Sequence, residues 1–341
     1  MSKKVFFASF LASFLIFGSW SFSRFEFFNS PPASSVSPEN SPADFSSQVP
    51  VNAVFVGDIM LSRSVAKQIA NAKDYQFPFL KVKDFLNQAD FVFGNLEGPI
   101  SDRGFDQGSI YSFRAEPKTA AGLKAANFKV VSLANNHIFD WGREALLQTI
   151  EILGKNNIFG IGAGKDLNAA NQILVFPVNG LRFGFFAGTS LYPESLEAGP
   201  NQPGVSRLEF EALAKEIQKI KTENLVDFMI VSLHWGEEYQ LAPTALQIEQ
   251  ARLLADSGAD LVLGHHPHVI QPYEKRGRGL IFYSLGNFVF DQSFSEETKT
   301  GLAVQVVFKH DRSFSAQLYR TRANEFFQPE LGELFDSLTV L

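Results

Sequence analysis

A group of histidines that directly follows a short, mostly apolar run restricts the folds open to this chain of 341 residues. The run covers residues 259–263 and leads into Gly264-His265-His266-Pro267-His268, which holds three of the six histidines. Such a run predicts a buried strand, and open α/β sheets bind their ligands at the carboxyl ends of strands. Two imidazoles one residue apart can bind one metal ion or two adjacent ions. The alternative is that the three rings only cap a strand in solvent.

The bulk composition predicts a globular core and excludes several chemistries. Hydrophobic residues make up 45% of the chain and charged residues 19%, as in soluble globular domains. The formal net charge of −6 does not favour polyanions, so we expect no nucleic acid partner. The absence of cysteine excludes disulfides, thiolate metal ligands and a thiol nucleophile.

The first 50 residues predict a membrane anchor and a tether. Lys3 and Lys4 precede the uncharged, mostly apolar segment 5–22, which has the length of a membrane span. We therefore expect residues 1–28 to be a signal or single-pass anchor, with the remainder of the chain on the extracytoplasmic side; secretion after cleavage of the signal is the alternative. Residues 29–50 are rich in Ser and Pro and predict a flexible linker.

Strands and helices alternate from Val51 to the histidine group, and the pattern after it is of strands alone. The expected strands are 51–56, 90–95, 128–133, 173–178, 181–187, 227–233, 259–263, 270–274, 280–285, 302–309 and 315–320. The expected helices are 62–72, 79–87, 117–126, 143–155, 208–221 and 243–257. This order predicts an α/β fold with two packed mixed sheets flanked by helices. We expect it to occupy residues 51–322, with 323–341 as a C-terminal tail.

Polar side chains follow five of the expected strands, at the point where each strand ends. The five groups are Asp58, then Asn95 and Glu97, then Asn135 to His137 with Asp140, then His234 with Glu237 and Glu238, and then His265, His266 and His268. Carboxylate, amide and imidazole groups together suit Zn²⁺, Mn²⁺ or Fe²⁺. Two such ions about 3.5–4 Å apart can clamp the oxygens of a displacement and generate hydroxide at neutral pH. We therefore expect a divalent metal centre here, with His265 in a packing or supporting role.

Six short motifs, taken together, resemble the CapA family of poly-γ-glutamate capsule biosynthesis proteins, also called PgsA. The motifs are Gly57-Asp58-Ile59-Met60, Asn95-Leu96-Glu97, Asn135-Asn136-His137, His234-Trp235-Gly236, Gly264-His265-His266-Pro267-His268 and Ser284-Leu285-Gly286-Asn287-Phe288. The family is similar to the calcineurin-like metallophosphoesterases, so the resemblance implies a four-layered α/β/β/α sandwich with a two-metal site. It also implies work at the outer face of the cell membrane, beside a polyglutamate ligase, on an anionic polymer or a phosphoester.

The resemblance assigns roles to individual residues. Asp58 resembles the carboxylate that opens the metallophosphoesterase site, and Glu97 or Asn95 stands at the position of the metal-bridging residue. His137 resembles the histidine that stabilises charge or protonates a leaving group, so His137 and Asp58 are the catalytic candidates. The remaining implied metal ligands are Asn136, His234, His266 and His268.

One position departs from the wider superfamily, and two arginines have open roles. Met60 stands where the superfamily usually has a histidine. The CapA pattern itself carries Met at this position, so the resemblance to the family is unaffected. The missing histidine is, however, an argument against inferring phosphatase activity from the superfamily. Arg63 and Arg114 are candidates for binding a carboxylate or phosphate, because a guanidinium suits both; structural ion pairs are the alternative.

Two functions follow as hypotheses. The first is an extracytoplasmic metal-dependent hydrolase that acts in poly-γ-glutamate capsule synthesis, or on another cell-envelope substrate. The second is a membrane-anchored assembly protein that supports polymer synthesis or export without catalysis.

Overall fold

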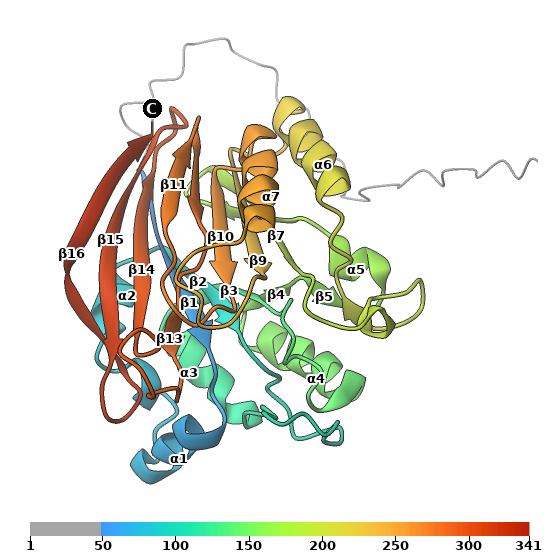
Figure 1. The fold of residues 1–341 in the computed structure, drawn as a ribbon, viewed down its shortest axis with the longest axis vertical. Helices are drawn as coiled ribbons and strands as arrows, with labels where there is room; N and C mark the ends of the chain where they lie inside the picture. The colour runs from blue at the N-terminus through green and yellow to red at the C-terminus, as the bar shows by residue number, and fades with distance from the viewer. Residues whose placement is uncertain (1–48, 341) are drawn as a thin grey trace, which may run out of the picture. The chain divides into compact units, whose positions relative to one another are not determined.

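The fold is that of a computed structural model that describes residues 49–340 (Figure 1). The expected anchor and all but the last two residues of the expected linker lie outside this range. Within residues 49–340 no helix is long and apolar enough to cross a membrane.

The first sheet has eight strands in the order β16-β15-β14-β1-β2-β3-β4, with β13 also pairing with β1. Strands β1 to β4 and β13 run parallel, while β14 to β16 form an antiparallel extension. Their bounds are β1 (Val51–Ile59), β2 (Phe91–Leu96), β3 (Phe128–Ser132), β4 (Phe159–Ile161), β13 (Asn287–Val289), β14 (Thr300–Phe308), β15 (Phe314–Ala323) and β16 (Pro329–Val340).

The second sheet has six strands in the order β11-β12-β10-β9-β7-β6. Its four central strands are parallel, and the edge strands β11 and β6 are antiparallel to their neighbours. The bounds are β6 (Leu174–Val178), β7 (Leu181–Thr189), β9 (Phe228–His234), β10 (Leu261–His265), β11 (Tyr273–Arg276) and β12 (Gly279–Phe282). Two short strands, β5 (Ala163–Gly164) and β8 (Gly204–Val205), pair with each other separately.

Three apolar clusters show that the two sheets pack face to face between two helical layers. Phe55 and Phe93 of the first sheet meet Phe185 and Phe282 of the second in the middle cluster. The alternate residues of β1, such as Val54, point to the outer face of the first sheet, as the period of two in a strand requires. The observed architecture is therefore the four-layered α/β/β/α sandwich that the resemblance implied.

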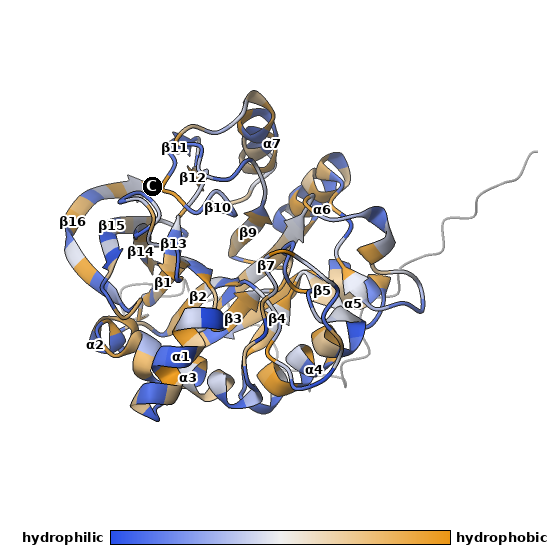
Figure 2. Cartoon of the chain, turned by 60° about the horizontal axis from the view of Figure 1, so that its bottom comes forward, coloured by the Kyte–Doolittle hydropathy of each residue, from blue (hydrophilic) through white to orange (hydrophobic). Residues whose placement is uncertain are grey.

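The helices cover the outer faces of the two sheets. Apolar residues of α1 (Arg63–Ala72), α2 (Lys83–Asn87), α3 (Ala120–Ala125) and α4 (Gly142–Lys155) belong to the cluster on the first sheet. Those of α6 (Phe210–Thr222) and α7 (Ala245–Asp256) pack on the second sheet. Figure 2 shows the inner strands mostly orange, whereas the outer helices α1 and α4 alternate between orange and blue. The remaining elements are α5 (Leu167–Asn171), η2 (Phe77–Phe79), η3 (Pro117–Thr119) and η4 (Glu194–Leu196).

Among the segments that differ from the sequence-based expectation, two are long enough to matter for the fold. Residues 323–341, expected to be a tail, contain the twelve-residue strand β16, which pairs with β15 from Val340 to Pro329. As an edge strand it buries few of its side chains, so its sequence lacks the continuous apolar face that marks a central strand. The helix expected over 79–87 is shorter, because η2 and a separate turn precede α2.

Candidate metal centre

The parallel strands of both sheets end at one edge and deliver acidic and imidazole side chains to it. The strand register sets Asp58 of β1 beside Asn95 of β2, and His234 of β9 beside His265 of β10. Glu97 follows β2 directly. Because the two sheets pack face to face, these four strand ends meet, and all five side chains are almost completely buried.

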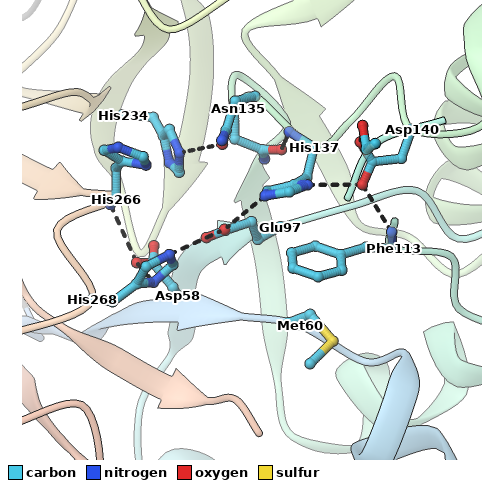
Figure 3. Close-up of polar contacts among 12 residues, drawn as sticks. Asp58, Met60, Glu97, Phe113, Asn135, His137, Asp140, His234, His266 and His268 are labelled. Carbon is cyan, nitrogen blue, oxygen red and sulfur yellow. Dashed lines mark hydrogen bonds and ion pairs between the residues drawn. The ribbon is translucent and has the colours of Figure 1, made fainter. Parts of the chain in front are cut away.

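Two groups of three side chains have ligand atoms close enough to hold a metal ion. Asp58, Glu97 and His234 form one group, and Glu238, His266 and His268 form the other, with ligand atoms within 4.8 Å of one another in each. Figure 3 shows the carboxylates of Asp58 and Glu97 next to the ring of His268, and the ring of His266 next to that of His234. The structure thus brings together the expected histidines and carboxylates from strands far apart in sequence.

Close backbone contacts at glycines position these residues. A side chain at Gly57, next to Asp58, would overlap the carbonyl oxygen of Gly286, and one at Gly264 would overlap that of Tyr283. In the histidine loop, His266 and His268 have φ angles of 95° and 59°. Such left-handed conformations cost free energy in residues other than glycine and cluster at functional sites. The loop is held in this geometry by its surroundings.

Unpartnered atoms in the centre fit a bound cation. Oε1 of Glu97 and Nδ1 of His266 are buried and have no hydrogen-bond partner. Buried polar atoms are nearly always paired in folded proteins, because an unpaired one costs about 1–3 kcal/mol. Carboxylate oxygen and imidazole nitrogen are ligands for borderline divalent ions. The residues present therefore fit the divalent metal that the sequence predicts.

The orientation of Asn135 fixes the orientation of Asn95. Asn135 donates from Nδ2 to the backbone oxygen of Leu96 at 2.8 Å and accepts at Oδ1 from the backbone N–H of His137 at 3.2 Å. Its amide nitrogen is thereby identified, and it also donates to Oδ1 of Asn95 at 3.1 Å. The amide nitrogen of Asn95 must then face the centre.

That amide nitrogen lies between the members of the first group. It is 2.8 Å from Oδ1 of Asp58, 3.3 Å from Oε2 of Glu97 and 3.2 Å from Nδ1 of His234. Asn95 therefore presents a hydrogen-bond donor, which differs from its expected role as a metal ligand. Of the two residues expected at the bridging position, Glu97 is the one with a free oxygen.

The hydrogen bonds of His234 define its tautomer. Nδ1 of His234 accepts from Asn95, so Nε2 donates to Oδ1 of Asn136 at 2.8 Å. The expected ligand Asn136 thus lies next to His234, and its side-chain oxygen accepts a hydrogen bond from that ring.

His137 is held by Asp140 and by a phenyl ring. Its Nδ1 lies 2.7 Å from Oδ2 of Asp140, and its ring stacks on Phe113 with centroids 3.9 Å apart. Nε2 then faces Oε1 of Glu97 at 4.0 Å. The orientation suits a residue that holds a proton at Nε2 toward the centre.

Burial and mutual charges drive the pKa values of the centre apart. Burial raises the pKa of Asp58, but hydrogen bonds with His265 and His268 outweigh it and hold this pKa well below its usual range. Burial raises the pKa of Glu97 well above its usual range. Burial also lowers the pKa of His266 to about 3, whereas the charges of Glu97 and Asp58 overcome burial and raise that of His268 to about 9. Pairs of titratable groups separated in this way are typical of functional sites.

Three residues singled out by the sequence lie outside the cluster of ligand atoms. Met60 is set apart from the cluster in Figure 3, and its sulfur accepts hydrogen bonds from Ser62. Arg63 forms an ion pair with Asp291. The guanidinium of Arg114 lies 3.4 Å from the ring centre of Trp141. Both arginines are therefore engaged within the protein.

Three residues gain roles that the sequence did not assign. Glu238 joins His266 and His268 as a potential ligand, and Oδ1 of Asn287 lies 2.9 Å from Nδ1 of His268. Asp140 orients His137 from one helical turn away. All three residues lie within or a few residues after the motifs named above, and this was the only sign of their roles in the sequence. Which polar residue of a loop faces inward depends on the path of its backbone.

Comparison with known proteins places the chain among capsule synthesis proteins. The family model described as "Bacterial capsule synthesis protein PGA_cap" matches residues 52–292. "Capsule biosynthesis protein CapA" of Bacillus anthracis is 36% identical over 256 residues, which cover 73% of this chain and 62% of that protein. "PGA biosynthesis protein CapA" of Bacillus subtilis (strain 168) is 34% identical over 255 residues, covering 74% and 66%. The chain thus spans less than two thirds of the length of each of these curated relatives.

Among solved structures, NAD nucleotidase (NadN) of Haemophilus influenzae resembles the chain in fold. The TM-score is 0.50 at 14% sequence identity, and the match covers 84% of this chain and 60% of that one. This likeness concerns the fold alone. The family match extends over all the strand ends that form the centre, so the chain belongs to the bacterial capsule synthesis protein PGA_cap family.

Proposed function

We propose that this chain is a metal-dependent hydrolase that acts in poly-γ-glutamate capsule synthesis. The observation that carries the proposal is the pair of unpartnered buried atoms, Oε1 of Glu97 and Nδ1 of His266, inside a cluster of carboxylates and imidazoles. A cluster that served stability alone would satisfy its own polar atoms.

The residues divide into those that hold cations and those that handle a proton. Asp58 and Glu97 would hold one divalent ion, with His234 joining them through Nδ1 in place of its hydrogen bond from Asn95. Glu238, His266 and His268 would hold a second, both ions drawn from Mn²⁺, Zn²⁺ or Fe²⁺. Bound there, the ions would supply Lewis acidity and a hydroxide at neutral pH.

His137 and Asn95 would act beside the ions. His137, oriented by Asp140, would hold a proton at Nε2 and pass it to a leaving group. Asn95 would orient Asp58 and Glu97 through its amide nitrogen.

The capsule role is supported by the family and by the names of the relatives. On this proposal the N-terminal segment anchors the chain in the cell membrane with the domain outside, next to a poly-γ-glutamate ligase. The bond cleaved is a γ-glutamyl amide or a phosphoester.

The test measures the metal content of the purified chain and its hydrolysis of γ-linked polyglutamate and of a phosphodiester. The proposal requires bound divalent metal and metal-dependent cleavage of the polymer that is lost in His137→Ala. Cleavage of the phosphodiester alone would instead support a phosphoesterase with another cell-envelope substrate. Failure to bind any divalent ion would refute both forms.

A second candidate is an assembly protein that supports synthesis or export without catalysis. The observation that favours it is Met60, whose sulfur is turned to Ser62 and offers no imidazole to the centre. In cells, His137→Ala would then leave capsule formation intact while deletion of residues 1–28 abolishes it. Capsule loss in His137→Ala at normal protein level would exclude this candidate.

A further inference from the structure

Three exposed aromatic rings stand on loops around the metal centre. Tyr111 follows β2 by a long loop, Tyr239 follows β9, and Phe294 follows β13; their side chains are 62%, 40% and 66% exposed. Exposed rings gathered beside a functional site commonly mark a binding surface. We call the loops 101–114, 235–244 and 290–299 the mouth of the centre.

Tyr239 is fixed in place rather than free in solvent. Its backbone N–H donates to the oxygen of Pro267 at 2.8 Å, and its hydroxyl accepts from Nε2 of Gln292 at 3.1 Å. The ring centre lies 6.1 Å from that of His268, and Phe294 meets the ring edge-on with centroids 5.1 Å apart. The two rings form a rigid aromatic corner beside a potential metal ligand.

Gln292 also connects this corner to the centre. Its Oε1 accepts from Nδ2 of Asn287 at 3.0 Å, and the other end of the Asn287 amide lies 2.9 Å from Nδ1 of His268. A group that binds against Tyr239 is thus held at a defined position relative to the centre.

The mouth is acidic. Residues 235–244 include Glu237 and Glu238, both exposed, and no basic residue. Residues 290–299 hold three carboxylates and one lysine. A field of this sign disfavours an anionic group at the corner and attracts a cationic one.

One basic side chain lies beside the mouth. Arg63 neutralises Asp291, and its guanidinium lies 5.1 Å from the ring centre of Phe113 and 5.9 Å from that of Tyr111. This contact also shows that aromatic faces in the mouth accept a cation. Aromatic rings combined with acidic side chains are how proteins recognise organic ammonium groups.

We propose that the corner formed by Tyr239 and Phe294 binds an ammonium group of the substrate. The assignment rests on the proposed function and deepens it. The centre would engage the amino end of a γ-glutamyl chain rather than its polyanionic interior, which the acidic mouth repels. An aminoalkyl phosphate also carries an ammonium group and is the other class of compound that the corner would bind.

The test compares probes that differ only in the ammonium group, using the full chain loaded with Mn²⁺ and calorimetric titration. The probes are γ-linked triglutamate against its N-acetylated form, and aminoethyl phosphate against ethyl phosphate. The expected result is that the ammonium form of a pair binds about 3- to 30-fold more tightly, as cation–π contacts produce. Equal binding within both pairs, or tighter binding of the uncharged forms, would overturn the proposal.

Matched variants locate the effect. Tyr239→Leu should remove the difference within a pair, whereas Tyr239→Phe should retain it because the ring remains. Phe159→Leu, at an exposed ring on β4 outside the mouth, should change nothing. A difference that survives Tyr239→Leu in a folded, Mn²⁺-binding protein would overturn the assignment to this corner.

The two phosphate probes separate this inference from the proposed function. Discrimination between aminoethyl and ethyl phosphate, without binding of either glutamyl probe, would support the ammonium site and contradict the polymer substrate. Binding of both glutamyl probes with equal affinity would support the polymer substrate and contradict the ammonium site.

Discussion

One group of carboxylates lies at the carboxyl ends of β1 and β2 and another at the amino ends of β9 and β10, and only the second is paired with lysine and arginine. Asp227 and Asp260 precede β9 and β10, at the amino ends of these strands. Asp260 accepts from Nζ of Lys221 and from the backbone N–H of Met229, both at 2.7 Å. Asp227 accepts from the backbone, Nε and Nη2 of Arg182 at 2.8, 3.1 and 3.0 Å.

The carboxylates at the other end receive much weaker partners. Asp58 has the amide of Asn95, the backbone N–H of His266 at 3.2 Å and two imidazoles, His265 and His268, at 3.3 and 3.4 Å. Glu97 has one free oxygen. A buried carboxylate needs a full counter-charge or several hydrogen bonds. The amino-end carboxylates are paired with Lys221 and Arg182, whereas Glu97 at the other end keeps an oxygen without a hydrogen-bond partner.

The largest expected effect is on metal binding. Asp58→Asn keeps the shape of the side chain but removes the charge, so we expect binding of Mn²⁺ or Zn²⁺ to fall by more than about 100-fold, beyond the loss typical of an outer partner. Calorimetric titration measures it. Glu97→Gln tests stability, because burial raises the pKa of Glu97 and one of its oxygens has no hydrogen-bond partner; the metal-free Glu97→Gln variant should be no less stable than the parent chain. A clear loss of metal-free stability in that variant would contradict the comparison.

The second effect is on folding, at the amino end. Lys221→Met leaves Asp260 buried without its cation, and breaking a buried pair from one side costs about 3–5 kcal/mol of unfolding free energy. Urea denaturation measures it, with metal affinity as the control that should not change. The double variant Lys221→Met, Asp260→Asn should recover most of the loss; if it does not, Asp260 is not the cause.

A smaller effect is expected at His265. This residue is wholly buried and contacts Asp58 without a metal partner of its own in either group. His265→Asn should reduce metal affinity by about 10- to 100-fold, the range for residues that orient a ligand. His310→Gln, at a half-buried histidine outside the centre, is the matched control. An unchanged affinity in His265→Asn would leave His265 with a packing role only.

The smallest effect is a pH dependence. Although burial raises the pKa of Asp227, its bonds with Arg182 outweigh burial and lower it below the usual value. The folded state therefore holds this proton less tightly than the unfolded state. Its contribution to stability is present above the ordinary Asp pKa and is lost as the pH falls through the lowered one. Thermal unfolding between pH 6 and pH 2, about the titration range of carboxylates, should show a shallower acid decline for Asp227→Asn.

The sequence predicted the parts of the fold that follow from regular patterns. Alternating strands and helices indicated the double sheet, and the polar strand ends indicated where the candidate centre lies. The dipeptide Asn179-Gly180, between the expected strands 173–178 and 181–187, is a preferred hairpin turn, and β6 and β7 do pair as a hairpin. These succeed because buried strands and turns have local signals. The strand β16 was missed because edge strands lack a continuous apolar face.

Details of the centre were beyond sequence reasoning because they depend on contacts between distant residues. The donor role of Asn95 follows from how Asn135 bonds to Leu96 and His137. The position of Glu238 depends on the backbone path after β9, and the pairing of Arg63 depends on Asp291, 228 residues away. No local pattern encodes these contacts.

The strand β1 changes its pairing partner along its length, and this restricts the substitutions that the protein tolerates. Residues Val51 to Val56 pair with β14, whereas Asp58 and Ile59 pair with β13, and Gly57 stands between the two pairings against the oxygen of Gly286. Gly57 meets no ligand and offers no chemistry, yet any side chain there would push the two strands apart at the centre. A deep mutational scan should therefore rank Gly57 with Asp58 among the least replaceable positions. Sequence variation during evolution should be as restricted at Gly57 as at Asp58.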